Sequence, residues 1–493
     1  MKKIFLILLL CLFLVVIFLL LKTFTYSSLP TSIELPPSGQ LHLDSLQTPQ
    51  RLAMALQFET ISCRDSANAK RAAFLDFQQF LQTAFPRVHS VLQKEIVNDL
   101  SLLFTWPGTN PAQKPILLMA HQDVVPVESA TLSAWHHPPF AGHIADGYIW
   151  GRGALDIKSG LMAILEAVEA LLAEDFQPTQ TIFLAFGHDE EIGGLNGAVQ
   201  IVRRLKQRNV ALELVLDEGG FIVNGVIPGL RQPVAIIGIA EKGYVSLKLQ
   251  SQVPGGHSSM PPHQTAIGQL CQAITHLEEN PFPANLKIMD RFFRHIAPAM
   301  PFLQRMVFAN LWLTSPLVEA QLSQSPTLNA AIRTTTAVTM FSGGINDNVL
   351  PLQATAIVNF RVLPGDSIQG VENFVRETID NPRIKISLVD SGSNPSPIAE
   401  INSSGYQILS VTIAQLMRDQ DIIIAPYLVI AATDSRHYTE IAQNVFRFIP
   451  IRLMPEDVNR IHGINERISQ DNYLEVINFY YQLIKNCAEI YTP

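Results

Sequence analysis

Four short segments of the chain combine histidine, aspartate or glutamate with the boundary of an apolar run. They read HQD after PILLMA, GRGALDIKSG before an amphipathic stretch, HDEE after TIFLAFG, and LELVLD followed by EGG. The side chains concerned are His121, Asp123, Asp156, Glu190, Glu191 and Asp217. Carboxylates gathered in one pocket repel one another unless cations compensate them. Carboxylate and imidazole together suit zinc or a similar divalent ion, and this number of ligands is enough for two ions that share a bridging carboxylate.

Three of the four segments follow apolar runs typical of strands that are buried on both faces. Ligand sites in open α/β sheets lie outside the carboxyl ends of the strands, so we expect these side chains to converge. Each segment alone is a weak signal, because an isolated Glu-Glu pair is usually a solvated helix start. Their order and their placement after strands favour one shared site.

Other hydrolytic mechanisms lack their sequence motifs. The chain contains no Gly-x-Ser-x-Gly nucleophile elbow, no His-Glu-x-x-His zinc helix and no glycine-rich phosphate loop of the two common patterns. Hydrolysis by a metal-activated water is the chemistry that the remaining residues support.

The elements that must position these residues alternate between strand and helix. Apolar runs predict strands over 115–120, 181–187 and 212–217, and residues at helical spacing predict helices over 157–172 and 194–207. Strand, helix and strand in this order indicate an α/β domain with a mostly parallel sheet and crossover helices on its faces.

The pattern changes after Lys242, where polar and apolar residues alternate as in a strand with one wet face. We expect an α+β module over 242–391, inserted between two parts of the catalytic domain at 49–241 and 392–493. Its predicted elements are strands over 244–250, 333–341, 353–362 and 384–389 and helices over 265–279 and 367–379. The module includes an apolar stretch, 281–332, with fewer charges than the chain average.

The N-terminus carries an uninterrupted apolar run of a length that spans a bilayer, from Ile4 to Leu21. We expect residues 1–22 to be an uncleaved signal-anchor and residues 23–48 to be a linker rich in proline and serine; the alternative is a cleaved signal peptide and secretion. Two lysines before the run and one after it favour a cytoplasmic N-terminus. The catalytic domain then lies on the extracytoplasmic side, which is periplasmic, luminal or extracellular.

Composition excludes some partners. The 493 residues carry a formal charge of −8, which argues against a nucleic-acid partner because phosphate binding needs a concentrated basic surface. Only 16% of residues are charged, where soluble domains usually carry about 25%. Residues 1–22 contain only three of these charges, so the anchor does not explain the low fraction. We favour an apolar substrate or a buried interface as the explanation for the low fraction of charged residues.

Together, HQDVVPV, GRGALDIKSG, GHDEEIGG, VLDEGG and RIHGINERIS resemble the ordered motifs of the dinuclear zinc exopeptidase and aminoacylase family. The resemblance covers about residues 49–490 and includes carboxypeptidase S, with the nearest likeness to the N-fatty-acyl-amino-acid synthase/hydrolase branch. It implies a zinc-peptidase catalytic domain with an inserted ferredoxin-like module that acts as a lid and dimerises.

The same resemblance implies a role for each matching residue. Each chain would hold two Zn²⁺ ions, with Co²⁺ or Mn²⁺ as alternatives. The Asp156 carboxylate would bridge the two ions. The implied metal ligands are His121, Asp156, Glu191, Asp217 and His462. Glu190 would be the general base, and Asp123 would orient the His121 ring. On the lid, His257 would stabilise the oxyanion, often across a dimer, and Asn348 and Arg361 would contact substrate. Arg436, in the substrate-side loop AATDSRHY outside the lid, would pair with a free carboxylate.

We therefore expect a membrane-anchored dizinc enzyme that cleaves the amide bond of N-acyl amino acids, with formation of the same bond as the reverse reaction. N-fatty-acyl amino acids are favoured because the apolar stretch 281–332 offers a candidate acyl channel. One alternative is a carboxypeptidase S-like enzyme that acts on short peptides. An alternative of another class is a receptor-like relative that has lost activity.

Overall fold

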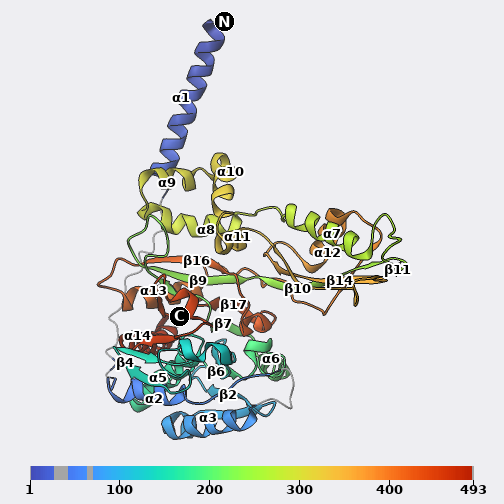
Figure 1. Ribbon diagram of the computed structural model, residues 1–493. Coiled ribbons are helices and arrows are strands. Elements are labelled where there is room, and N and C mark those ends of the chain that lie inside the picture. The colour runs from blue at the N-terminus through green and yellow to red at the C-terminus, as the bar shows by residue number, and fades with distance from the viewer. Residues whose placement is uncertain (1, 27–40, 42, 64–69, 491–493) are drawn as a thin grey trace.

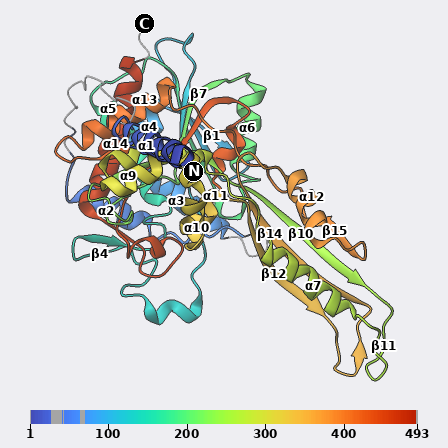
Figure 2. The same cartoon turned by 90° about the horizontal axis from the view of Figure 1, so that it is seen from above.

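The structure is a computed structural model that describes residues 2–26, 41, 43–63 and 70–490 (Figure 1). Most of the expected linker over 23–48 lies outside these described residues. A main body carries a long single helix at one end and a narrow module that projects from its side (Figures 1 and 2).

A ten-stranded sheet forms the centre of the body, and the strands at its middle are parallel. In spatial order its strands are β1 (Gln93–Val97), β2 (Ser101–Trp106), β6 (Ile182–Gly187), β3 (Ile116–His121), β7 (Leu212–Asp217), β17 (Ala442–Arg447), β9 (Val234–Glu241), β8 (Ile222–Val223) and β18 (Arg452–Leu453), with β16 (Ile423–Val429) paired to β9. Strands from both ends of the sequence share this sheet, so the chain leaves the main body and returns to it. The fold is therefore mixed α/β with a mostly parallel centre, as the apolar runs predicted.

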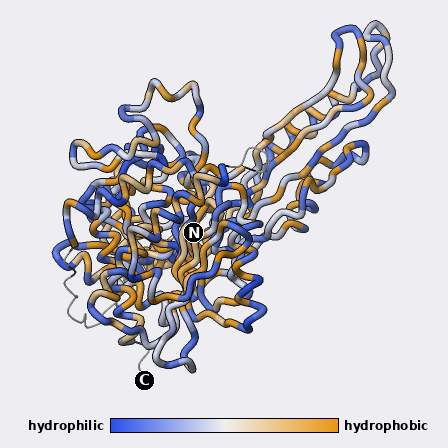
Figure 3. The backbone as a smooth tube through the Cα atoms, turned by 90° about the horizontal axis from the view of Figure 1, so that it is seen from below, coloured by the Kyte–Doolittle hydropathy of each residue, from blue (hydrophilic) through white to orange (hydrophobic). Residues whose placement is uncertain are grey.

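Successive residues of the central strands face opposite sides of the sheet, and both sides are buried. Leu118 belongs to the core packed against α5 (Lys158–Ala173), whereas its neighbours Leu117 and Met119 belong to the core packed against α6 (Ala198–Gln207). Figure 3 shows the resulting concentration of apolar chain in the main body. The helices of this body are α2 (Gln47–Ala55), α3 (Arg71–Ala84), α4 (Pro86–Val91), α5 (Lys158–Ala173), α6 (Ala198–Gln207), α13 (Ser404–Leu416) and α14 (Gln470–Ile490). A small sheet at its side contains β19 (Arg467–Ser469), β5 (Tyr148–Trp150) and β4 (His143–Ala145).

The projecting module is an antiparallel four-stranded sheet with two helices, and its core is separate from that of the body. Its strands, in spatial order, are β12 (Thr335–Gly343), β14 (Gln353–Val362), β10 (Gly243–Gln252) and β15 (Ile384–Leu388); its helices are α7 (Ala266–Glu279) and α12 (Ile368–Ile379). A two-stranded ribbon of β11 (Gly256–His257) and β13 (Val349–Leu350) forms its far end (Figures 1 and 2). The four strands of the larger sheet and the two helices lie within one or two residues of the predicted ones, whereas the ribbon was not predicted.

The apolar stretch 281–332 differs from expectation, because only its first residues, through Phe282, pack in the core of the projecting module, whereas its helices do not. It folds into α8 (Lys287–Ile296), α9 (Phe302–Ala309), α10 (Leu311–Leu322) and α11 (Pro326–Ile332). Phe292, Phe293 and Ile296 join the core of the main body, and the Phe292 ring packs against Tyr427 of β16. The physical reason is that the edge strand β16 presents an apolar surface that these helices cover.

The N-terminal run forms one helix, α1 (Lys2–Phe24), which is long and apolar enough to cross a membrane. None of its most apolar stretch is buried against the rest of the protein, so it is not a core helix. It projects away from the body in Figure 1.

Candidate metal centre

Three adjacent parallel strands, β6, β3 and β7, end at the site. His121 is the last residue of β3 and Asp217 is the last residue of β7. Glu190 and Glu191 lie in a short 3-10 turn that follows β6, and Asp156 lies in the loop before α5. The strand ends therefore bring together residues that are far apart in the sequence, as expected for an open α/β sheet.

His121, Asp156 and Glu218 form a first group of ligand atoms that all lie within 4.8 Å of one another. The Nε2 atom of His121 lies 3.1 Å from Oδ1 of Asp156 and 2.9 Å from Oε1 of Glu218. All three side chains are largely buried, with the imidazole almost completely so. One imidazole nitrogen and two carboxylates from this group could bind one divalent ion.

Asp156, Glu191 and His462 form a second group with the same spacing. The Nε2 atom of His462 lies 2.9 Å from Oδ2 of Asp156 and 3.2 Å from Oε2 of Glu191. The two groups therefore use different oxygens of the same Asp156 carboxylate. His462 is half exposed, so this group is open on one side.

Asp217, expected from the sequence as a ligand, is in neither group, and Glu218 takes the corresponding place. Consecutive side chains at the end of a strand point to opposite sides, so only one of this pair can face Asp156. The Asp217 carboxylate instead contacts the Ser435 backbone, because its Oδ2 accepts a hydrogen bond from the backbone N–H of Ser435 at 2.9 Å. The sequence signal that could have identified Glu218 as a ligand is its position directly after Asp217 in the motif VLDEGG.

Asp123 connects the His121 ring to the turn that carries the two glutamates. Its Oδ1 lies 3.3 Å from Nδ1 of His121, the nitrogen on the opposite side of the ring from Asp156. The same carboxylate accepts hydrogen bonds from the backbone N–H groups of Glu190, at 3.2 Å, and Glu191, at 3.1 Å, and from the Ser62 hydroxyl at 2.6 Å. It thereby fixes the ring orientation and the position of both glutamates.

The electrostatics of the site show an excess of buried negative charge. Burial and the neighbouring Asp156 carboxylate raise the pKa of Glu218 to about 8. Burial also raises the pKa of Glu190 well above its usual value, and the nearby acids Asp434 and Glu218 add to this effect. Hydrogen bonds to Asp156 and Glu191 raise the pKa of His462 to about 10. The ligand groups thus carry an excess of negative charge that divalent cations would offset.

A buried ion pair that the motif reading did not single out supports both ligand loops. Nη1 of Arg152 lies 2.6 Å from Oε2 of Glu466, and neither side chain is appreciably exposed. The other oxygen of Glu466 accepts hydrogen bonds from the backbone N–H groups of Gly153, Leu155 and Asp156. Nη2 of Arg152 donates to the backbone carbonyls of His462 and Gly463. Both residues stand within the quoted motifs GRGALDIKSG and RIHGINERIS, which was the available signal.

Two of the expected substrate contacts, Arg361 and Arg436, lie near each other. Burial and the positive charge of Arg436 lower the pKa of Arg361, whose guanidinium lies 5.1 Å from the centre of the Tyr244 ring. Arg436 donates a hydrogen bond to the carbonyl of Gly193, directly after the turn that carries Glu190 and Glu191. Each guanidinium group is of a type that can pair with a carboxylate.

The other two expected lid residues, His257 and Asn348, lie together at the far end of the projecting module, on the β11–β13 ribbon (Figure 2). The carbonyl of Asn348 accepts a hydrogen bond from the backbone N–H of Ser258, and both expected residues are exposed. Within one chain they therefore lie apart from the two metal-ligand groups.

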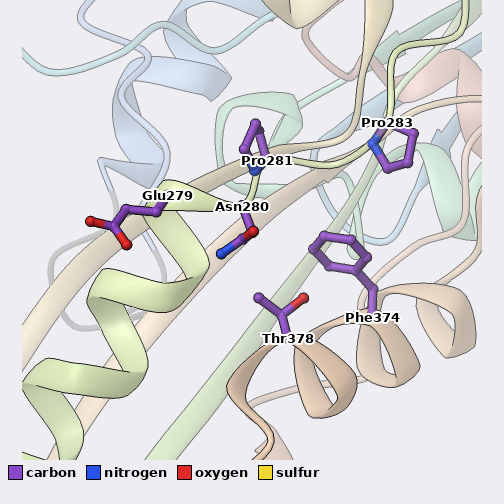
Figure 4. Close-up of a pocket in the computed structure, with 6 residues that line it drawn as sticks. All are labelled: Glu279, Asn280, Pro281, Pro283, Phe374 and Thr378. Carbon is purple, nitrogen blue, oxygen red and sulfur yellow. The ribbon is translucent and has the colours of Figure 1, made fainter.

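A pocket on the projecting module lies between the end of α7 and α12 (Figure 4). Phe374 and Thr378 of α12 point toward Asn280, and Pro281 and Pro283 form the upper edge. None of its lining residues belongs to the metal-ligand groups, so this pocket gives no support to an acyl channel that leads to them.

Comparison with known proteins agrees with the geometry. The model of peptidase family M20/M25/M40 matches residues 117–486. A probable carboxypeptidase S-like protein of Dictyostelium discoideum is 42% identical over 96% of this chain and 92% of its own length. An N-fatty-acyl-amino acid synthase/hydrolase of Danio rerio is also 42% identical, over 88% of this chain and 84% of its own length.

The fold has a counterpart among solved structures. An M20 family metallo-carboxypeptidase from Sulfolobus solfataricus superimposes with a TM-score of 0.63 at 19% identity, and the match covers 91% of this chain and 100% of that one. At this identity the likeness establishes the fold alone.

Proposed function

The chain belongs to peptidase family M20/M25/M40, a family of metal-dependent hydrolases, and from this premise we propose that it is a dizinc amidohydrolase. His121 and Glu218 would bind one ion, Glu191 and His462 would bind the other, and Asp156 would bridge them. The observation that carries this proposal is that the two oxygens of Asp156 face the two separate ligand groups. Co²⁺ or Mn²⁺ would suit the same ligands.

The ligands fit a metal site by their chemistry. Oε1 of Glu191 is buried and has no hydrogen-bond partner among the described residues, which is costly for a carboxylate unless a cation binds it. Four acidic groups share this small region with two imidazoles: Asp156, Glu190, Glu191 and Glu218. Divalent ions would relieve their repulsion.

Zinc ions, when bound, lower the pKa of water and polarise a substrate carbonyl. Glu190 lies beside the first group, with its Oε2 4.0 Å from Nε2 of His121, and is not itself in either ligand group. We assign it as the general base that accepts the proton of the attacking water and returns it to the leaving nitrogen. Asp123 holds both this turn and the His121 ring in position.

Replacing Glu218 by glutamine is expected to remove about half of the bound zinc, because this side chain supplies a charged ligand to one group only. Asp217→Asn, the matched control, is expected to leave the zinc content nearly unchanged since that side chain bonds to the Ser435 backbone. Elemental analysis after dialysis measures both. The opposite pattern would restore Asp217 as the ligand and exclude Glu218.

N-fatty-acyl amino acids are the substrate class that we favour. The support is the similarity to N-fatty-acyl-amino acid synthase/hydrolases, together with Arg436, whose guanidinium lies beside the turn of the two glutamates and is of a type that pairs with a free carboxylate. The similarity to a carboxypeptidase S-like protein supports the alternative, hydrolysis of short peptides with a free carboxyl end. A receptor-like relative without activity is disfavoured, because the complete ligand set is retained.

The choice between these substrates is testable with purified enzyme. We expect kcat/KM for N-oleoyl-phenylalanine to exceed that for a blocked dipeptide by about tenfold or more, equivalent to ~1.4 kcal/mol of transition-state stabilisation. N-acetyl-phenylalanine is the matched control, because it has the same amide and carboxylate without the long chain. A preference for the dipeptide over both acyl amino acids would make the protein a peptidase.

For location, we propose that α1 anchors the protein and that the catalytic domain lies on the extracytoplasmic side. The support is the length of α1 and the lysines that precede it. We further propose that the projecting module serves as the lid and pairs with a second chain. Such pairing is what would bring the exposed His257 at the module's far end to a metal centre.

A further inference from the structure

The base of α1 is not isolated from the rest of the protein, because it packs against helices α9 and α10. The rings of Phe18 and Trp312 lie 5.9 Å apart, and those of Phe24 and Phe302 lie 5.6 Å apart. Asn310 donates hydrogen bonds to the Leu19 carbonyl at 3.4 Å and to the Thr23 hydroxyl at 3.2 Å. These contacts fix the level of α9 and α10 relative to the apolar helix.

That level can be compared with the thickness of a bilayer. An α-helix rises about 1.5 Å per residue, so a hydrocarbon core of about 30 Å takes about 20 residues. Counted from Ile4, the first apolar residue after the two lysines, this thickness ends near Thr23. Phe18 would then lie ~7 Å inside the apolar core. Trp312, whose ring contacts that of Phe18, would then lie near the same depth.

The outer surface of α9 and α10 is rich in exposed apolar side chains, as a position inside the apolar core of a bilayer requires. Leu303 is 70% exposed, Leu317 is 63% exposed and Trp312 is 54% exposed. Phe302 and Leu313 are exposed as well. The apolar residues of α10 are not confined to one side of the helix, and only Val318 and Leu322 are buried, so much of its apolar surface is exposed.

Charge is almost absent from this surface. Helices α9 and α10 contain two charged side chains, Arg305 and Glu319, and Glu319, toward the end of α10, is paired with Arg333. The Arg305 guanidinium is directed at the end of α1, where it donates hydrogen bonds to the backbone carbonyls of Phe24 and Tyr26. The one cation therefore secures α1 and leaves the outer face apolar.

We propose that α9 and α10 are embedded in the outer leaflet of the same bilayer that α1 crosses, with Trp312, Leu313 and Leu317 among the lipid acyl chains. Interfacial helices insert their apolar faces about 5–10 Å into this boundary, and tryptophan is enriched there. The depth inferred from Phe18 agrees with that range. The inference rests on the proposed membrane anchor and is independent of the proposed hydrolysis.

The embedding has a consequence for the catalytic domain. Helix α8, which precedes α9, is part of the main core through Phe292 and Phe293. The α8–α11 helices therefore join the sheet directly to the membrane surface. The domain would lie against the bilayer, where lipid-like molecules are concentrated, and would not swing freely on its linker.

Tryptophan fluorescence of the full-length protein in phosphatidylcholine vesicles tests this proposal. Of the four tryptophans, all within the described residues, only Trp312 is exposed; the buried ones are Trp106, Trp135 and Trp150. With lipids brominated on the acyl chain near the headgroup, we expect the emission due to Trp312 to fall by more than half. The Trp312→Phe variant isolates that emission and is expected to lose little in the same lipids.

Two further variants test the apolar face itself. Leu303→Glu, Leu313→Glu and Leu317→Glu combined should release Trp312 from the quencher. A matched variant with glutamate at the exposed positions Leu75, Leu132 and Leu352 should not. Unchanged quenching in the first variant would overturn the proposal.

The outcomes separate this inference from the functional proposals. A full-length chain that fails to float with vesicles would overturn both the anchor and the inference. A chain that floats while Trp312 is unquenched would overturn the inference alone, and cross-linking through α10 would then identify a second copy as its partner. The hydrolytic role is judged separately, since Glu190→Gln is expected to abolish turnover and leave the quenching unchanged.

Discussion

Glu190→Gln is expected to lower kcat by about 10²–10⁴-fold, the range that general acid–base catalysis contributes. Glutamine has nearly the same shape as glutamate, but its amide cannot accept the proton of the attacking water. The backbone N–H of residue 190 would still donate to Asp123, so the turn should keep its position. Initial rates with an N-acyl amino acid measure the change.

The zinc content of the same variant gives the decisive control. Glu190 is in neither ligand group, so Glu190→Gln should bind as much zinc as the unmodified protein, whereas Glu218→Gln should lose about half. An unchanged kcat would remove Glu190 from the role of base. A parallel loss of zinc and activity would make Glu190 a ligand instead.

Much of the fold could be predicted because the relevant signals are local. The buried strands β3, β6 and β7 are short apolar runs, and α5 shows helical spacing of its apolar residues. The stretch 281–332 could not be placed in the same way. Its residues are apolar on several sides, and their partners, β16 and α1, are distant in the sequence.

The site shows a similar division. His121, Asp156, Glu191 and His462 were expected to meet, and the structure brings them together. The choice between the adjacent acids Asp217 and Glu218 was not available from spacing, because it depends on which way each side chain leaves the end of β7. The direction is set by Ser435, more than 200 residues away along the chain.

Glu466→Ala is expected to lower the free energy of unfolding by about 3–5 kcal/mol, because it leaves the Arg152 guanidinium buried without its counter-ion. Both side chains are nearly inaccessible to water. The control is Glu475→Ala, which breaks the pair with Arg452 at the same distance of 2.6 Å. Those side chains are 27% and 35% exposed, so the cost there should be at most about 1 kcal/mol. Urea denaturation measures the loss of unfolding free energy in each variant. Equal losses would contradict the conclusion that the buried Arg152–Glu466 pair matters more for stability than the exposed Arg452–Glu475 pair.

Glu466 should also act on zinc binding, because its carboxylate holds the backbone of the loop that ends in Asp156. Loss of such a support typically weakens metal affinity by about 10–100-fold. The double variant Arg152→Leu with Glu466→Leu separates the two effects. It removes both buried charges, so stability should largely recover, whereas the backbone hydrogen bonds stay broken and zinc affinity should stay low. Recovery of zinc affinity together with stability would show that Glu466 contributes only as a counter-ion.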